Sequence, residues 1–241
     1  MTSWKLILSP DLSGRAHMDL DLKHFQDLEN GITPSILRIY SWKPNCISLG
    51  YSQKVEKEID ADKARILGWD VVKRPTGGGI VFHNEAEVTY SLVTSIDNPL
   101  LPKGLVPSFK KISEAIVLAL HGIGISSEIR NSKFDIRNSR SQLCFSYPTE
   151  YEIVVEGPST LLGAGRKIVG AAQKRGRKAL LQQGSIFVQR TPAEAFSVLK
   201  RQHDDIDAAS VEEVLGREAG FGELSHALVK GFEEKLGVKF G

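Results

Sequence analysis

The chain has 241 residues, and its 41% hydrophobic and 25% charged content is that of an ordinary soluble globular protein. Its 31 basic and 29 acidic residues leave a net charge of +2, which gives no reason to expect a nucleic-acid partner. The two cysteines, Cys46 and Cys144, cannot make a disulfide framework, and without a cysteine–histidine cluster no structural zinc site is expected. No signal-peptide pattern or apolar run of about 20 residues is present, so we expect a cytoplasmic protein without a membrane span.

The first elements along the chain are strands and one amphipathic helix. Met18, Leu22, Phe25 and Leu28 recur at the spacings of three and four that make one apolar helix face. Strands are predicted by alternation and by β-branched or aromatic residues, and a second helix is bounded by glycine. The predicted strands are residues 4–9, 35–42, 46–50 and 69–74, with the second helix at residues 60–68.

Two further features stand out in the middle of the chain. Residues 79–95 predict two antiparallel strands around the polar turn HNEAE. The clearest helix covers residues 106–124, with Ser108 as its N-cap and Gly122 at its end. Its buried stripe is predicted to be Ile112, Ala115, Ile116 and Ala119.

The remaining segments alternate between the two types without a strict βαβ order. Strands are predicted at residues 125–130, 151–157, 167–173 and 179–189, and helices at 191–202, 210–216 and 223–237. We therefore predict an α+β fold in which mixed or antiparallel sheets are packed with helices. One domain is expected over residues 1–241, with no separate C-terminal accessory domain.

A glycine-rich loop lies in the sequence KRPTGGGIVFH, residues 73–83. Its spacing is that of neither a P-loop nor a dinucleotide-binding fingerprint, and a purely structural turn or bulge would also use glycine. Lys73 and Arg74 lead into it from a strand, however, and successive glycine N–H groups can face an anion without a side chain in the way. The loop therefore predicts a site for a phosphate, a mixed anhydride or an acyl carbonyl.

A second basic stretch, GRKIVGAAQKRGRKALLQQGS, begins at residue 165. Lys167 stands just before an apolar strand whose small residues, Gly170 and Ala171, would let a ligand lie against it. A lysine at such a place can hold an acyl carbonyl or a phosphate as a point charge. Residues 174–178 are better explained as a solvated basic hairpin, and Cys46 as a small buried hydrophobic side chain.

Together, RPTGGGIVFHNEAEVTYSLV and GRKIVGAAQKRGRKALLQQGSIFV resemble the lipoate–protein ligase family, and LRIYSWKPNCISLGYSQ also fits. That family is related to biotin–protein ligases and to octanoyltransferases that make lipoyl precursors. The resemblance implies an α+β catalytic domain that holds lipoate or octanoate in a tunnel and transfers the acyl group to one lysine of a lipoyl domain. The implied partners are lipoyl domains of 2-oxoacid dehydrogenase complexes or the glycine cleavage H protein, with no nucleic acid and no membrane.

The resemblance also implies roles for particular residues. The backbone of Gly77, Gly78 and Gly79 would line the acyl and phosphate site with Arg74 alongside. His83 would close the loop and Lys167 would contact the acyl carbonyl.

Two chemistries are compatible with these motifs. Our first prediction is a ligase that activates lipoate or octanoate with ATP and Mg²⁺, because Gly79 keeps a ligase-like triple glycine with room for a nucleotide phosphate. The alternative is an octanoyltransferase without a cofactor, in which Cys144 takes the acyl group from acyl carrier protein. QLCFSYPTEYEIVVEG resembles the cysteine segment of such transferases, and Tyr151 and Glu152 replace the Asn-Asp pair usual in ligases.

A catalytically silent acyl-binding module is a third possibility, although the intact loop and Lys167 argue against it. Residues 157–165 form a longer loop than the family usually places before the Arg-Lys pair, and we assign it no function.

Overall fold

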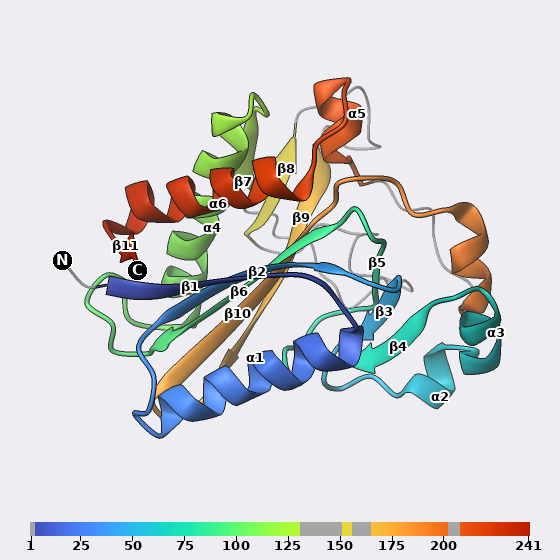
Figure 1. Ribbon diagram of the computed structural model, residues 1–241, viewed down its shortest axis with the longest axis horizontal. Coiled ribbons are helices and arrows are strands. Elements are labelled where there is room, and N and C mark those ends of the chain that lie inside the picture. Colours follow the sequence, from blue (N-terminus) through green and yellow to red (C-terminus); the bar gives the residue numbers. More distant parts are fainter. Residues whose placement is uncertain (1–2, 131–150, 156–164, 202–207) are drawn as a thin grey trace.

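A large mixed sheet forms the centre of the computed structural model, which describes residues 3–130, 151–155, 165–201 and 208–241 (Figure 1). In this part of the chain the sheet has eight strands, with β1 parallel to β2 and to β11 and all other neighbours antiparallel. Their spatial order is β11 (Lys239–Phe240), β1 (Ser3–Leu12), β2 (Ile36–Trp42), β6 (Val88–Ser95), β10 (Ala179–Ile186), β9 (Arg166–Arg175), β8 (Glu152–Val155) and β7 (Ser127–Arg130).

A small second sheet lies at one end of the large one. In it β3 (Cys46–Leu49) is parallel to β4 (Asp70–Lys73) and antiparallel to β5 (Val81–His83). The short helices α2 (Val55–Glu58) and α3 (Ala61–Ile66) connect its strands, and the 3-10 helix η2 (Ala193–Val198) packs against it. Trp69, Phe82 and Phe196 make edge-to-face contacts there, so the small sheet has an aromatic core of its own.

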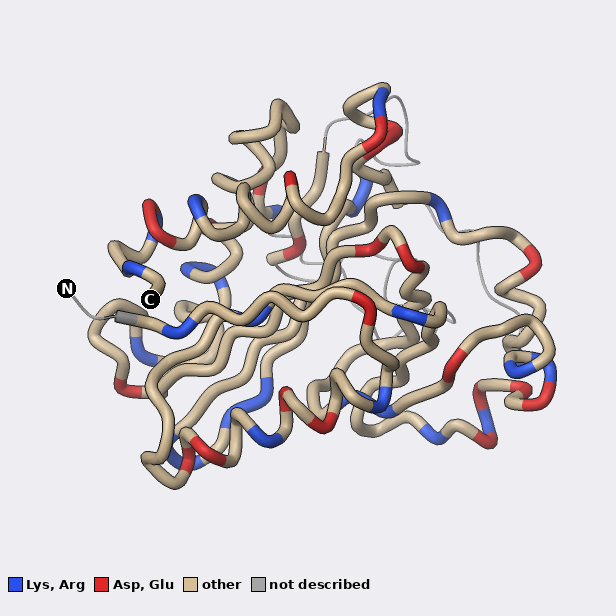
Figure 2. The backbone as a smooth tube through the Cα atoms, in the orientation of Figure 1, with Lys and Arg blue, Asp and Glu red and all other residues tan. Residues whose placement is uncertain are grey.

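Helices cover both faces of the large sheet (Figure 1). On one face, α1 (Gly14–Glu29) packs Phe25 and Leu28 against Val93 and Leu181. On the other face lie α4 (Leu105–Gly122) and α6 (Phe221–Leu236), and the short helix α5 (Val211–Leu215) lies at one end of the sheet. A side chain at Gly231 would collide with the backbone of α4, so this glycine allows the two helices to pack closely. Figure 2 shows that the charged residues lie mostly on the helices and connections rather than on the central strands.

The predicted α+β class is confirmed, and both the predicted stripe of α4 and the burial of Cys46 are correct. The helical face predicted for α1 is correct except at Leu22, which is 37% exposed. Asp21 is fully buried instead, because a network of hydrogen bonds compensates its charge. No helix of the described residues is both long enough and apolar enough to cross a membrane.

The predicted N-cap at Ser108 is wrong. α4 begins earlier, at Leu105, with Gly104 as its N-cap. Ser108 lies inside the first turns, where its hydroxyl donates to the carbonyl oxygen of Gly104 at 2.7 Å. Serine in a helix interior commonly bonds back to the preceding turn in this way. Serine is also favoured at N-caps, so its residue type alone does not distinguish the two positions.

The two strands around HNEAE exist, but they do not pair with each other. β5 pairs with β3 in the small sheet, whereas β6 lies between β2 and β10 in the large one. The turn between them therefore crosses from one sheet to the other. Asn84 holds this turn through its side-chain oxygen, which accepts from the N–H of Ala86 at 3.1 Å. The crossing brings His83 and Glu87 face to face.

Candidate active site

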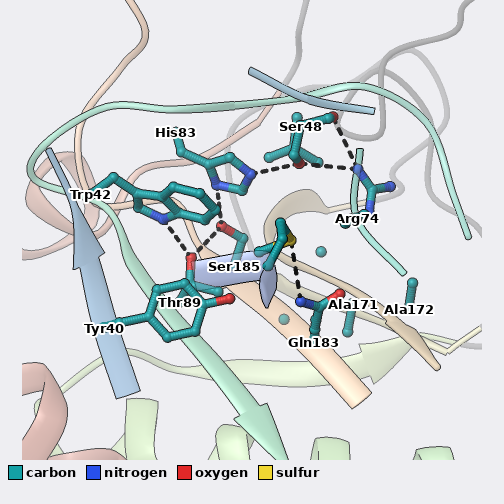
Figure 3. Close-up of a pocket in the computed structure, with 14 residues that line it drawn as sticks. Tyr40, Trp42, Ser48, Arg74, His83, Thr89, Ala171, Ala172, Gln183 and Ser185 are labelled. Carbon is teal, nitrogen blue, oxygen red and sulfur yellow. Dashed lines mark hydrogen bonds between the residues drawn. The ribbon is translucent and has the colours of Figure 1, made fainter. Parts of the chain in front are cut away.

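A cavity of about 370 Å³ lies where the two sheets and α1 meet (Figure 3). The small sheet contributes residues of β3 and β5, α1 contributes Met18, and the large sheet contributes residues of β2, β6, β9 and β10. The lining residues are Met18, Tyr40, Trp42, Ser48, Arg74, Val81, His83, Thr89, Gly170, Ala171, Ala172, Gln183, Gly184 and Ser185. The exposed surface inside it is almost entirely apolar, because its polar side chains bond to one another.

One wall of the cavity is made by small residues. Gly170, Ala171 and Ala172 follow one another on β9 and leave the strand nearly flat. Tyr40, Trp42 and Met18 supply large apolar surfaces around it. Such a slot can hold an unbranched aliphatic chain by burial alone, at about 0.8 kcal/mol for each methylene.

Arg74 organises the glycine loop from inside. Its side chain is 8% exposed, and its Nη2 donates to the carbonyl oxygens of Gly77 at 2.7 Å and Gly79 at 2.6 Å. Gly78 has φ +92°, a backbone conformation that favours glycine. The predicted loop and arginine thus come together, but Arg74 lines the cavity and the three glycines are not among its lining residues.

His83 lies at the centre of a hydrogen-bonded chain on the side of the small sheet. Burial, with the positive charge of Arg74 nearby, holds the pKa of His83 well below its usual value, so the ring is neutral. Arg74 Nη1 donates to Ser48 Oγ at 3.1 Å, which leaves the Ser48 hydroxyl free to donate to His83 Nε2 at 2.7 Å. The Nδ1–H of His83 then donates to Glu87 Oε1 at 2.5 Å.

The chain of hydrogen bonds continues into the large sheet. Ser185 donates to Glu87, and its Oγ lies 3.3 Å from that of Thr89. Trp42 Nε1 donates to Thr89 Oγ1 at 2.9 Å, and its ring stacks on His83 with centroids 4.0 Å apart. Figure 3 shows Trp42, Thr89 and Ser185 pointing toward one another and toward His83 along the cavity wall. The network fixes the ring of His83 and links the two sheets across the site.

A second buried network, which was not predicted from the sequence, lies behind the cavity. Asp21 accepts from Arg38 Nη1 at 2.7 Å, from Ser91 at 2.6 Å and from Gln183 Nε2 at 2.7 Å. Gln183 lines the cavity and also accepts from Thr76 Oγ1 at 2.8 Å, which ties the glycine loop to β10. The available signal was Asp21 itself, three residues after Met18 on the buried helix face, where an acidic side chain requires partners.

Lys167 is buried, with 3% exposure, and forms an ion pair with Glu152 on the neighbouring strand β8. It lies on the wall strand three residues before Gly170 but is not itself a lining residue of the cavity. Glu152 is one of the two residues that replace the Asn-Asp pair expected of a ligase. Cys144 and residues 157–164 of the long loop lie outside the described residues.

The match to known sequences identifies the family. Residues 13–233 match the family model of the lipoyl protein ligase A/B catalytic domain. The chain belongs to this family. It is 33% identical to the octanoyltransferase LipM of Clostridioides difficile (strain 630), over 100% of this chain and 89% of the relative. It is 35% identical to that of Carboxydothermus hydrogenoformans, again over 100% and 89% of the two chains. The protein is therefore an enzyme of the lipoate ligase and octanoyltransferase family, which acts in protein lipoylation.

Solved structures of the family share the fold. A lipoate-protein ligase A bound with ATP superposes with a TM-score of 0.76 and 24% identity, over 99% of this chain and 87% of that one. A bipartite lipoate protein ligase from Thermoplasma acidophilum, studied with its E2 lipoyl domain, gives a TM-score of 0.69 and 23% identity, over 100% and 86%. At these identities the likeness concerns the fold alone. Among the described residues, no group of three or more His, Cys, Asp or Glu side chains is placed to hold a metal ion.

Proposed function

We propose that this enzyme transfers an octanoyl group from the thioester of acyl carrier protein to the lysine of a lipoyl domain. The observation that supports this most strongly is the 33–35% identity to octanoyltransferases over the whole of this chain. The apolar cavity with its flat β9 wall suits an eight-carbon chain. The reaction needs no nucleotide, because a thioester is already activated toward an amine.

In this proposal Cys144 is the nucleophile. Its thiolate attacks the carbonyl carbon of the carrier thioester, the old carbon–sulfur bond breaks, and the carrier leaves as a thiolate that takes up a proton from solvent. The neutral amine of the acceptor lysine then attacks the new thioester on Cys144. An amide forms, the amine gives up a proton, and Cys144 returns as thiolate. We expect positive charge near Cys144 to favour this thiolate by lowering the pKa of the thiol.

Lys167 would stabilise the oxyanion that forms in both steps. It lies buried on β9, the strand that forms the cavity wall, and its ion pair with Glu152 holds the side chain in place. Arg74 and His83 would hold the shape of the site and would not transfer a proton during the reaction. The guanidinium of Arg74 donates a hydrogen bond to a carbonyl oxygen of the glycine loop. The neutral imidazole of His83 is held between Ser48 and Glu87.

An ATP-dependent ligase, our first prediction, is the second candidate. Its main support is the triple glycine, because Gly79 leaves room for a nucleotide phosphate where a side chain would block it. In that case ATP and Mg²⁺ would enter the reaction and Cys144 would be dispensable. The same lipoyl domains would be acceptors in either case, and we place both reactions in the cytoplasm.

An intact-mass assay on a lipoyl domain separates the candidates. We expect an octanoyl mass increment with octanoyl carrier protein in the absence of ATP, and loss of this increment in Cys144→Ser. Serine keeps the size of cysteine, but its far higher pKa leaves almost no anion at neutral pH. Acylation only from free lipoate or octanoate with ATP and magnesium, undiminished in Cys144→Ser, would establish the ligase. Octanoate binding without either reaction would indicate a silent acyl-binding module.

A further inference from the structure

A second, larger hollow of about 1270 Å³ adjoins the cavity between α1 and β4, and we call it the α1–β4 groove. The residues that line it are Arg15, Met18, Asp19, Leu22, Tyr51, Val71, Val72, Lys73, Arg74, Pro75 and Lys174. It shares Met18 and Arg74 with the cavity. A ligand whose tail fills the cavity can therefore continue into the groove.

The groove combines an apolar floor with a cationic rim. Met18, Val71 and Val72 are apolar, and Leu22 is 37% exposed on α1. Tyr51 is 68% exposed, and the ammonium groups of Lys73 and Lys174 lie 5.8 and 5.6 Å from the centre of its ring. Two lysines from distant parts of the sequence thus converge on one aromatic side chain.

The charge on this rim is not balanced by the described residues. Asp19, the acidic residue of the groove, is paired with Arg15 at 2.8 Å. No described carboxylate lies within ion-pair distance of Lys73 or Lys174. Two neighbouring ammonium groups repel each other, and an anion between them would relieve this repulsion. The rim therefore suits a ligand that carries a phosphate.

We propose that the α1–β4 groove binds the phosphate-bearing pantetheine arm on which acyl carrier protein presents its thioester. This inference rests on the proposed function. The arm has a phosphodiester at one end, an apolar dimethyl group in the middle and the acyl thioester at the other end. With the acyl chain in the cavity, the groove receives the remainder of the arm, and Lys73 and Lys174 meet its phosphate. The acceptor lysine of a lipoyl domain has a short aliphatic side chain without an anionic group, so it would form no ion pair with Lys73 or Lys174.

The test compares two octanoyl donors with the full-length enzyme. One donor is octanoyl carrier protein, and the other is octanoyl-pantetheine, which has the same thioester without the phosphate or the protein. We expect the double variant Lys73→Glu and Lys174→Glu to lower kcat/KM for octanoyl carrier protein at least about thirtyfold. The loss with octanoyl-pantetheine should be several-fold smaller. The matched control is Lys230→Glu, an exposed lysine on α6 across the large sheet, which should keep wild-type kcat/KM with both donors.

The outcomes separate this inference from the function on which it rests. If wild-type enzyme takes no octanoyl group from the carrier, the proposed function fails. If wild type reacts but the double variant keeps wild-type kcat/KM for the carrier, only the groove assignment fails. Equal losses with both donors, together with a raised KM for the lipoyl domain, would assign the groove to the acceptor and overturn the inference.

Discussion

The cavity and the α1–β4 groove share two residues, but they differ in how the charged side chains that line them are compensated. In the cavity the guanidinium of Arg74 bonds to loop carbonyls, and His83 stays neutral between Ser48 and Glu87. In the groove Lys73 and Lys174 face solvent and an aromatic ring without a described carboxylate beside them. A buried charge requires compensation, whereas a charge in water can remain available for a partner. The apolar lining of the cavity therefore suits an aliphatic chain, and the lysines of the groove suit the anion that we propose for it.

The largest expected effect comes from removing the buried lysine. Lys167→Ala should lower acyl transfer by roughly a thousandfold, because it removes the ammonium that we propose as the stabiliser of the oxyanion. It should also lower the free energy of unfolding by about 3 kcal/mol, since the buried ion pair with Glu152 is broken. Lys174→Ala, in the groove, should change the unfolding free energy by less than about 0.5 kcal/mol. Steady-state kinetics and chemical denaturation measure both quantities, and near-wild-type turnover in Lys167→Ala would refute its role.

Gly78→Val tests whether the glycine loop serves the cavity. A side chain at this position would require φ +92°, and its Cβ would lie 2.9 Å from Arg74 Nη2. We expect a loss of roughly a hundredfold in acyl transfer and about 1–2 kcal/mol in stability. For folding, the control is Gly77→Ala, whose Cβ would meet nothing within 4 Å and should leave the unfolding temperature unchanged. If Gly78→Val binds octanoate normally and regains activity at low temperature, the loop is only a structural turn.

A smaller effect is expected from filling the flat wall of the cavity. Ala171→Leu should reduce octanoyl transfer by roughly tenfold, because part of the slot along β9 is occupied and buried methylene contacts are lost. Transfer of a butyryl group from the same carrier should fall much less. Leu22→Ala, in the groove, should affect octanoyl and butyryl donors alike. Equal losses for both chain lengths in Ala171→Leu would show that this wall does not contact the acyl chain.

The smallest expected effect is on the pH dependence of stability, and it concerns His17, which is buried behind the cavity. Burial and the neighbouring Arg38 lower the pKa of His17 to about 4. Between pH 6.5 and 4 the unfolded chain therefore binds a proton that the folded chain does not, and stability falls as the pH falls through this range. In His17→Gln this part of the pH dependence should disappear from denaturation curves measured at successive pH values. An unchanged slope would mean that His17 titrates normally in the folded protein.

Much of the fold and part of the site could be predicted from local pattern. The stripe on α4 and the strands around β10 follow from periodicity, because a repeat of 3.6 or 2 residues shows which face is buried. Arg74, His83, Gly170 and Ala171 were all predicted as site residues, and the structure brings them to one cavity. Their motifs were recognisable because they are short and contiguous. The family follows from the same motifs and is confirmed.

Only the tertiary structure decided how these pieces face one another. Periodicity shows that β5 and β6 are strands but not that they belong to different sheets, since pairing depends on contacts distant in sequence. For the same reason the burial of Asp21 was not predicted, because it depends on Arg38, Ser91 and Gln183 from three other elements. Lys174 lies in a hairpin and faces solvent as predicted, but only the fold shows that it lies beside Tyr51 and Lys73. Residue type sets what chemistry a side chain can do, and long-range packing sets which partners make that chemistry available.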